Sequence, residues 1–302
     1  MLNLHPQKIA IGSTKLGLAY GAVSQEKVPN KTALDILRHM RSMGFDMIDT
    51  APSYGNAQQL IGEAFHSDVG NETSLKIVTT LSAIQTDSIN SADIEKVHKD
   101  FLDSLQKMNM SSIYAVLIHN SADLLKKGSD QLANLLQLLK SDGLVKKIGV
   151  SVYTPEETNI FYNRYDFDLI QFPLNIFDQR FLRSKSLDWL AEKQVEIHAR
   201  SVFLKGVLLK PEIKDGLPLS LLKQNAKFHA FLQKNNINAY EACMNFVMEQ
   251  TLVDRWVIGV SKTEQIDNMI KFISNGSSIN SDLFEFESWS LTSDAALDPR
   301  CW

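Results

Sequence analysis

The sequence is poor in the features that mark several classes of protein. Only Cys243 and Cys301 are cysteines among 302 residues, and they lie too far apart to indicate a disulfide framework or a metal-binding knuckle. No stretch approaches the ~20 apolar residues of a membrane span. The N-terminus lacks the charged start and apolar core of a signal peptide. These absences predict a protein of the reducing cytoplasm that has no membrane partner.

An excess of charge of one sign is also missing. The 31 basic and 35 acidic residues give a net charge of −4 and are spread along the chain, so no basic stripe indicates nucleic-acid binding. The seven histidines form no H-x-H or H-E-x-x-H run, so no metal site is expected. With 44% hydrophobic residues the chain has ample material for a core. We therefore expect a protein that acts on small molecules; the sequence carries no signal of an oligomeric state.

Eight short apolar runs recur along the chain, and most of them are separated by segments with helical periodicity. In 57–64 and 132–139, for example, apolar residues recur at i, i+3, i+4 and i+7. Apolar strands that alternate with helices indicate a parallel sheet covered by helices, and eight such units match a closed (β/α)8 barrel. The predicted strands are 8–13, 45–51, 75–80, 113–119, 146–152, 167–173, 195–201 and 255–261.

The barrel is predicted to be a single α/β domain over residues 1–302. No linker divides the chain, and the one loop-like stretch, about 206–235, follows the seventh strand. Residues from about 276 to 302 are expected to form a tail over the rim. The alternative is a doubly wound open sheet, but Gly12, Gly17 and Gly21 lack the G-x-G-x-x-G spacing of a dinucleotide-binding turn. We therefore favour the (β/α)8, or TIM, barrel.

Polar residues end or follow the predicted strands. In a barrel of this type, chemistry gathers at the carboxyl ends of the strands, so these residues are candidates for a site. They are Asp49, Tyr54, Thr79, Thr80, His119, Ser151, Gln171, Asn175, Arg200, Ser201 and 259–262.

Several of these residues lie in motifs that resemble the aldo-keto reductases, NAD(P)H-dependent barrel enzymes. The stretch "IDTAPSYGNAQQLIGEA" at 48–64 is similar to a family signature, and agreement continues through "LIH", "GVSVYTPEE", "IQFPLN", "ARSVFLKGVLL" and "IGV" over essentially the whole chain. "SVY" at 151–153, "RS" at 200–201 and the closing "LDPRCW" most resemble a bacterial branch associated with surface-polysaccharide and sugar biosynthesis. The resemblance implies reduction of an aldehyde or ketone, which could be sugar-derived.

The resemblance also implies a catalytic set of Asp, Tyr, Lys and His. Tyr54 would donate a proton to the carbonyl oxygen as hydride arrives, while Asp49 and His119 stand at matching positions. The family lysine lowers the pKa of the tyrosine, since a nearby cation favours the phenolate. At that position this chain has Thr80.

Two lysines are candidates to replace the missing cation. Lys76 lies on the same strand face, but four residues at ~3.3 Å each place it about 13 Å down the barrel. Lys205 follows the seventh strand and is a more remote candidate. Without a cation, Asp49 would raise the pKa of Tyr54 or become protonated itself. Losing a general acid costs ~10² to 10⁴ in rate, so a slow reductase is one expectation.

Two other functions remain open from the sequence. One is a catalytically weak or silent NADP-binding barrel that acts as a sensor or partner protein. The other is a barrel isomerase or lyase that uses Asp49 and His119.

The cofactor site is implied by the same resemblance. Ser151 and Gln171 would hold the nicotinamide carboxamide, and Arg200 would stack on the ring. Backbone N–H groups before the predicted helix at 263 could receive phosphate oxygens, and Lys262 could meet an adenosine 2′-phosphate, which favours NADP over NAD. Met269 stands where the family pattern has an adenine-side Asn. The implied cofactor-binding residues are Ser151, Gln171, Arg200, Ser201, Phe203, Leu204, Gly206, Gly259, Val260, Ser261, Lys262 and Gln265.

Several of these residues also have purely structural interpretations. Arg200 could pair with Asp178 and leave a cofactor untouched, and Gln171 could be a hydrogen-bonding residue of the rim. Lys262 could be a solvated residue at a helix start. Asn56 is expected to cap the helix that follows Tyr54.

Overall fold

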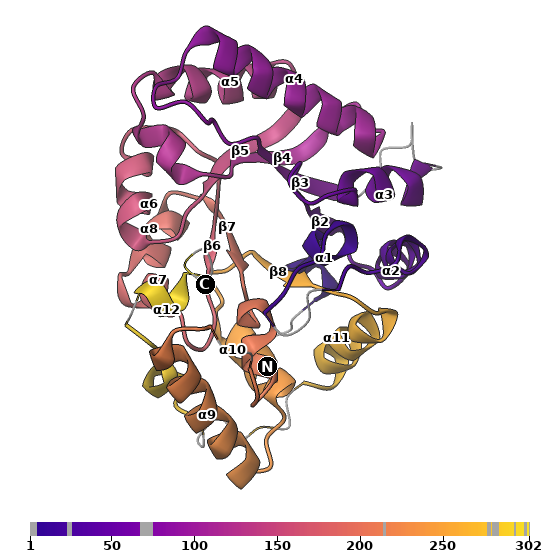
Figure 1. Ribbon diagram of the computed structural model, residues 1–302, viewed down its shortest axis with the longest axis vertical. Helices are drawn as coiled ribbons and strands as arrows, with labels where there is room; N and C mark the ends of the chain where they lie inside the picture. Colours follow the sequence, from indigo (N-terminus) through magenta and orange to yellow (C-terminus); the bar gives the residue numbers. More distant parts are fainter. Residues whose placement is uncertain are drawn as a thin grey trace.

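Eight parallel strands close into a barrel in the computed structural model, which describes residues 5–22, 26–66, 75–213, 216–276, 279, 284–292, 294–298 and 301. Neighbouring strands follow the chain order, and β8 pairs with β1 to complete the circle (Figure 1). The strands are β1 (Ile9–Gly12), β2 (Met47–Asp49), β3 (Lys76–Leu81), β4 (Ile113–Ile118), β5 (Val145–Ser151), β6 (Leu169–Pro173), β7 (Glu196–Arg200) and β8 (Arg255–Gly259). Each overlaps one predicted run, with β3 and β5 extending one residue beyond it, so the single-domain (β/α)8 barrel is confirmed.

Helices surround the strands as an outer layer (Figure 1). No helix in the described part of the chain is long and apolar enough to cross a membrane. The α-helices are α1 (Thr14–Gly17), α2 (Asn30–Ser42), α3 (Ala57–Ala64), α4 (Ser91–Met108), α5 (Ser129–Ser141), α6 (Pro155–Tyr162), α7 (Arg180–Arg183), α8 (Ser186–Glu192), α9 (Leu219–Lys234), α10 (Ala239–Glu249), α11 (Thr263–Asn275) and α12 (Asp294–Leu297). Short 3-10 helices are η1 (Pro6–Lys8), η3 (Ser121–Leu125), η4 (Leu204–Leu209) and η6 (Phe286–Trp289).

The apolar side chains form two cores because successive residues of a strand point to opposite faces. The larger core fills the space between the barrel and its helices. The smaller one lies inside the barrel, where Ala10, Met47, Val78, Ala115, Leu117 and Leu169 meet. Thus every second side chain of a strand faces the interior of the barrel. The residues at these positions determine which polar groups lie at the two ends of the barrel.

The predicted loop at 206–235 is wrong for its second half, because residues 219–234 form helix α9. The buried residues of this helix are Leu221, Asn225, Phe228 and Leu232, at a spacing that keeps one face toward the core. Phe228 packs edge-on against Phe177 and Trp289. The apolar stripe is interrupted by Asn225, which instead donates to the carbonyl oxygen of Lys210 at 2.8 Å.

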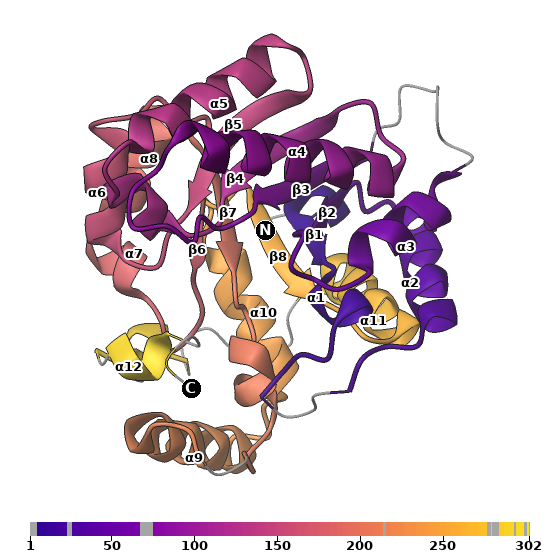
Figure 2. The ribbon, with the colours of Figure 1, turned by 45° about the horizontal axis from the view of Figure 1, so that its top comes forward.

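The C-terminal segment packs against loops that follow β6 and β7. Leu291 N–H donates to the carbonyl oxygen of Phe177 at 2.8 Å, and Gln179 donates to that of Phe286 at 2.7 Å. Figure 2 shows α12 beside α9, outside the ring of helices. Residues 277–278, 280–283, 293, 299–300 and 302 of the expected tail lie outside the described residues.

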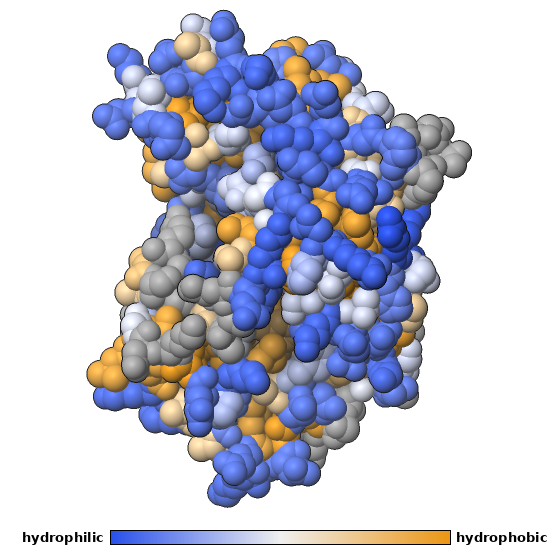
Figure 3. Space-filling view, turned by 45° about the vertical axis from the view of Figure 1, so that its right-hand side comes forward, coloured by the Kyte–Doolittle hydropathy of each residue, from blue (hydrophilic) through white to orange (hydrophobic). Residues whose placement is uncertain are grey.

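Hydrophilic side chains cover most of the face shown in Figure 3, and the apolar ones form smaller patches between them. The large apolar side chains that are exposed, such as Leu125, Leu138 and Leu219, come from different helices. Scattered apolar residues of this kind are normal for a protein surface.

Candidate active site

The register of the barrel arranges its interior side chains in layers. In a barrel with a shear of eight, the residue at a given height along the barrel axis lies one position further along each successive strand than the residue paired with it in the sheet. Successive side chains of a strand alternate between the interior and the exterior, so each interior layer is made of side chains from every second strand. The register therefore puts Gly12, Thr80, Ser151 and Arg200 in one layer near the carboxyl end. The layer beneath contains Asp49, Leu117, Gln171 and Val257.

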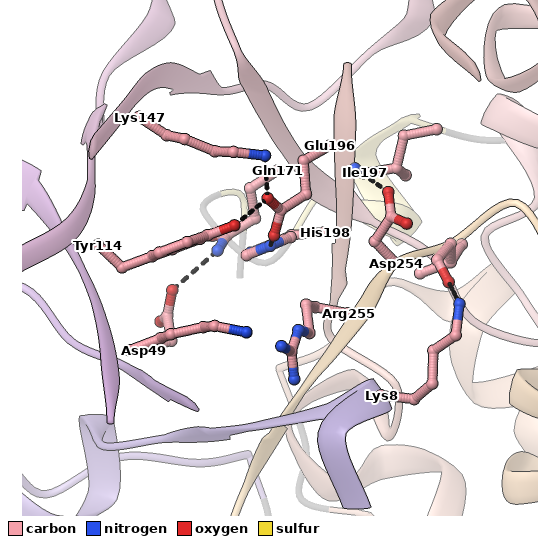
Figure 4. A network of polar contacts seen from close by, with 12 residues as sticks. Lys8, Asp49, Tyr114, Lys147, Gln171, Glu196, Ile197, His198, Asp254 and Arg255 are labelled. Atoms are coloured by element: carbon pink, nitrogen blue, oxygen red, sulfur yellow. Dashed lines mark hydrogen bonds and ion pairs between the residues drawn. The ribbon is translucent and has the colours of Figure 1, made fainter. Parts of the chain in front are cut away.

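Asp49 ends β2 and is buried, with 7% of its surface exposed. Its Oδ2 accepts a hydrogen bond of 2.8 Å from Gln171 Nε2, across the barrel (Figure 4). Burial raises the pKa of the carboxyl group to about 6, although the hydrogen bond and the charges of His198 and Arg200 oppose this shift. Within the described residues Asp49 forms no ion pair, so both of its protonation states are accessible near neutral pH.

Tyr54 lies in the turn between β2 and α3, and this turn is held by the chain segment after β1. Gly55 has φ +57°, and a Cβ atom added to Gly17 would lie 1.9 Å from the carbonyl oxygen of Tyr54. Ser13 N–H donates to the carbonyl oxygen of Asp49 at 2.9 Å. Only glycine therefore fits at position 17, and this close contact fixes where Tyr54 stands relative to Asp49.

The electrostatic surroundings of Tyr54 keep its phenol protonated. Burial and the carboxylate of Asp49 raise its pKa, while a hydrogen bond with Thr14 and the charge of Arg200 lower it. Asn56 occupies the N-cap position of α3, as expected, but its side chain does not cap the helix. It contacts Lys27 and Asn30 instead, which ties α2 to the Tyr54 turn.

Thr80 points into the barrel from β3, in the layer above Asp49. Its hydroxyl oxygen is buried and has no hydrogen-bond partner among the described residues. Lys76 lies at the opposite end of the barrel, where its Nζ is 3.1 Å from Asp46. Lys205 Nζ lies 5.5 Å from the centre of the Tyr20 ring.

His119 and Arg200 complete the carboxyl end of the barrel. Burial and the charge of Arg200 lower the pKa of His119, so the imidazole is neutral at physiological pH. The Arg200 guanidinium lies 4.2 Å from the centre of the Tyr153 ring, and its Nη2 is 3.4 Å from the carbonyl oxygen of Val152.

The alternative pairing of Arg200 with Asp178 is wrong. Asp178 is fully buried and binds Arg180 through two hydrogen bonds of 2.8 and 2.9 Å. This local pair satisfies the carboxylate, and the charge of Arg200 acts on Asp178 only by opposing the rise in its pKa that burial causes. Asn175 shows a structural role, since it donates to the carbonyl oxygen of Ser201 and accepts from two backbone N–H groups.

The expected cofactor residues fall into two groups. Ser151 is buried beside Gln171 on the neighbouring strand, as the pairing of β5 with β6 requires. After β7, the backbone takes left-handed φ values at Ser201, Leu204 and Gly206, with Leu204 fully buried and Phe203 partly exposed. Such conformations are costly for residues other than glycine and cluster at binding sites.

The second group lies between β8 and α11. Gly259 is exposed and a Cβ atom there would meet nothing within 4 Å, whereas Val260 is buried. Gln265 Oε1 accepts hydrogen bonds from the N–H groups of Ser261 (2.7 Å) and Lys262 (3.1 Å). The helix start that was expected to receive phosphate is thus capped by its own side chain. Met269 is part of the buried core, so it faces away from this surface.

A buried polar network at the other end of the barrel was not predicted from the sequence. Glu196 accepts hydrogen bonds from Tyr114, Lys147 and His198, the last at 2.6 Å (Figure 4). Arg255 binds Asp46 at 2.7 and 3.3 Å. Tyr114, Lys147, Glu196 and Arg255 border an open hollow of about 680 Å³. The sequence signal that could have revealed this network is the presence of polar residues at inward-facing positions of otherwise apolar strands.

Comparisons with known proteins agree with this architecture. The sequence model described as "Aldo/keto reductase family" matches residues 8–280. Among curated proteins, the aldo-keto reductase YhdN of Bacillus subtilis is 24% identical over 58% of this chain, and the match spans only about half (54%) of that protein. The NADH-specific methylglyoxal reductase of Escherichia coli is 22% identical over 70% of this chain and 72% of its own.

Solved structures share the fold. The aldo-keto reductase AKR11C1 of Bacillus halodurans, in its holo form, superposes with a TM-score of 0.71 at 16% identity, covering 97% of this chain and 94% of its own. The glycerol dehydrogenase AKR11B4 of Gluconobacter oxydans has a TM-score of 0.65 at 22% identity, with coverages of 91% and 88%. The family match extends over most of the barrel, from the residue before β1 to beyond α11, and the chain belongs to the aldo/keto reductase family.

Proposed function

We propose that this protein is an NAD(P)H-dependent reductase that converts an aldehyde or ketone to an alcohol. Family membership supports an oxidoreductase. The observation that carries the proposal is the placement of Asp49 and of the Tyr54 turn at the carboxyl end of the barrel, where the segment after β1 fixes both of them. The carboxylate of Asp49 helps to raise the pKa of Tyr54, and His119 and Arg200 follow β4 and end β7 at the same end. A phenol beside a titratable carboxyl group can deliver a proton to a carbonyl oxygen.

The residues present fit the nicotinamide end of the cofactor. Ser151 and Gln171 offer a hydroxyl and an amide, which match the hydrogen-bonding groups of a carboxamide. Arg200 offers a planar guanidinium at the carboxyl end of the barrel, 4.2 Å from the centre of the Tyr153 ring. At the phosphate end, Gln265 occupies two N–H groups, so we propose that its side chain turns away when the cofactor binds.

The chemistry follows from the charges of these side chains. A bound reduced nicotinamide would supply hydride to the carbonyl carbon. Tyr54, protonated because burial and Asp49 raise its pKa, donates its phenolic proton to the carbonyl oxygen. His119, neutral because burial lowers its pKa, hydrogen-bonds the same oxygen and orients it. Asp49 holds Gln171 in place through the 2.8 Å hydrogen bond.

Thr80 sets the expected rate of this reaction. We propose that it occupies the position of the family lysine, because its side chain points inward in the layer directly above Asp49. The buried hydroxyl cannot stabilise a tyrosinate as an ammonium ion does. Turnover is therefore expected to be slow, in line with the ~10² to 10⁴ that a general acid contributes.

A second candidate function is a catalytically silent cofactor-binding barrel. The observation that favours it is the buried carboxyl of Asp49, which lacks an ion-pair partner among the described residues and has a raised pKa. Such a protein would bind NAD(P)H through the same residues and signal the redox state to a partner.

We further propose NADPH as the preferred cofactor and a small polar carbonyl compound, sugar-derived ones included, as the substrate. Lys262 is exposed at the start of α11, where its charge can meet a 2′-phosphate. Asp49, Gln171 and His119 give the carboxyl end of the barrel a polar character. The names of two relatives, a methylglyoxal reductase and a glycerol dehydrogenase, point to small polar compounds.

Two measurements test these proposals in sequence. Titration of NADPH, followed by quenching of tryptophan fluorescence, should show binding at micromolar concentrations. Loss of the absorbance of the reduced nicotinamide is then measured with a panel of aldehydes and keto-sugars. Binding with turnover supports the reductase, binding without turnover supports the silent barrel, and no binding below millimolar concentrations rejects both.

The variant Thr80→Lys sharpens the second measurement. If no other cation assists Tyr54, this substitution should raise the turnover rate by about 10²-fold or more; if another cation already assists it, the gain should be small. The matched control is Thr79→Lys, which places a lysine on the outward face of β3, where Thr79 bonds Gln58, and should not raise turnover.

A further inference from the structure

We propose that Arg200 is the cation that assists proton transfer from Tyr54, so that β7 supplies the charge that β3 lacks. The inference rests on the proposed reductase function and assigns Arg200 a role beyond contact with a cofactor. It follows from the side chains that make up one layer of the barrel, from the contacts of the guanidinium and from the effect of its charge on neighbouring groups.

The layer above Asp49 contains one long side chain and three short ones. Gly12, Thr80 and Ser151 leave the interior open, and Arg200 enters it from β7. In an eight-stranded barrel, β7 lies opposite β3, so the arginine and a lysine at position 80 would extend toward the same interior space. Two cations desolvated there would repel each other, and the short Thr80 leaves the space to Arg200.

The guanidinium makes two contacts with residues that follow β5. It lies 4.2 Å from the centre of the Tyr153 ring and 3.4 Å from the carbonyl oxygen of Val152, both just beyond the end of β5. Asp178, the acid expected to pair with it, is bound to Arg180. Among the described residues Arg200 forms no ion pair, so no acid neutralises its charge directly.

The charge of Arg200 reaches the groups that carry the proposed chemistry. It opposes the rise that burial causes in the pKa of Asp49 and of Tyr54 and adds to the lowering of the pKa of His119, as it also opposes the rise in the pKa of Asp178. Lys76 lies beside Asp46 at the opposite end of the barrel, and Lys205 Nζ lies over the ring of Tyr20.

The proton balance of the step is simple. The O–H bond of Tyr54 breaks and an O–H bond forms on the substrate, while the carbonyl carbon is reduced by hydride from the reduced nicotinamide, which is oxidised. The tyrosinate left behind is stabilised by the guanidinium until solvent returns a proton. Arginine keeps its charge at any working pH, so this assistance does not titrate away in alkaline solution.

The test compares Arg200→Met with the double variant Thr80→Lys/Arg200→Met, and uses the exposed Arg183→Met on α7 as the matched control. Single-turnover rates are measured with saturating NADPH across pH, and cofactor affinity is measured separately by fluorescence. Arg200→Met should slow the single-turnover step about 10²- to 10³-fold. The single-turnover rate of the double variant should be at least about tenfold higher than that of Arg200→Met, since a lysine from the opposite wall restores the charge. Its rate should fall at high pH as the lysine titrates, which the wild-type rate should not do.

The outcomes separate this inference from the proposed function. If the wild-type protein binds no NADPH or turns over no carbonyl compound, both the proposed function and the inference that rests on it are rejected. If the wild type is active and Arg200→Met keeps its single-turnover rate, the inference alone is overturned. It is also overturned if Arg200→Met loses only cofactor affinity, or if Thr80→Lys gives no recovery in the Arg200→Met background.

Discussion

The close contact of Gly17 with the Tyr54 turn gives a sharp prediction. In Gly17→Ala, the new Cβ atom would lie 1.9 Å from the carbonyl oxygen of Tyr54, 2.4 Å from the backbone nitrogen of Ala57 and 2.7 Å from its Cβ atom. Real Cβ contacts do not fall below 3.0 Å, so the turn must move by about 1 Å, and the atoms in the way are mostly backbone. Tyr54 moves with this turn.

A displacement of this size should lower the catalytic activity strongly and the unfolding free energy only moderately. A misplacement of about 1 Å at a reacting group can lower activity by about 10²-fold, whereas overpacking typically costs ~1 to 3 kcal/mol of unfolding free energy. We therefore expect kcat/KM of Gly17→Ala to fall by about 10²-fold in a protein that still folds. The assays are NADPH oxidation with the best substrate of the panel and urea denaturation.

Gly62→Ala is the matched control for this variant. Its Cβ atom would lie 2.4 Å from the carbonyl oxygen of Lys107, so it overpacks the contact of α3 with α4 instead of the Tyr54 turn. It should lose a similar ~1 to 3 kcal/mol and keep kcat/KM within about threefold. The reasoning is refuted if Gly17→Ala keeps wild-type kcat/KM, or if both variants lose activity equally.

Three further predictions concern buried or exposed charges. Because burial raises the pKa of Asp49 to about 6, the folded chain binds this proton more tightly than the unfolded chain. The unfolding free energy should therefore fall as pH rises from about 4 to about 6, by roughly 2 to 3 kcal/mol relative to Asp49→Asn, and urea denaturation across pH measures this. Burial raises the pKa of Glu196, but hydrogen bonds from His198 and Lys147 outweigh burial and lower it. This carboxylate should therefore stabilise the fold at pH values above its ordinary pKa, and the stabilisation should be lost in acid. Glu196→Gln should cost about 3 to 5 kcal/mol at neutral pH by the same assay, and a change below about 1 kcal/mol would contradict it. Lys262→Ala should raise KM for NADPH about tenfold while KM for NADH stays within about twofold, and an equal rise for both would show that the lysine does not contact a 2′-phosphate.

The fold was largely predictable because barrel strands are buried on both faces. Runs such as 113–119 and 167–173 are nearly continuous apolar segments, which stand out from the amphipathic helices between them. The helix at 219–234 was missed because Asn225 interrupts its apolar stripe. That asparagine is buried only because its amide reaches the carbonyl oxygen of Lys210, a contact that no local pattern shows.

The carboxyl-end residues were predictable from their place after strands, but their partners were not. Asp49 and Gln171 are 122 positions apart, and their hydrogen bond depends on the register of the closed barrel. The contact of Gly17 with Tyr54 likewise joins two loops that the sequence presents separately. Gln265 could be expected near the start of α11, but whether its amide caps the helix or faces a ligand depends on a side-chain torsion.

The polar network around Glu196 shows where pattern reasoning could have gone further. Lys147, Glu196, His198 and Arg255 interrupt apolar strands at positions of inward parity, which is a readable signal. What the parity cannot provide is the pairing, since Tyr114 and Lys147 reach Glu196 from strands β4 and β5.

The most direct test of the account is the rate of NADPH oxidation by wild-type protein and by Tyr54→Phe with the carbonyl panel, with cofactor affinity measured in both. We predict slow but measurable turnover in the wild type, a loss of at least about 10²-fold in Tyr54→Phe, and the same affinity for NADPH in the two proteins. Equal turnover by the two proteins would contradict the assignment of Tyr54 as proton donor, and so would a wild type that binds NADPH but reduces no member of the panel.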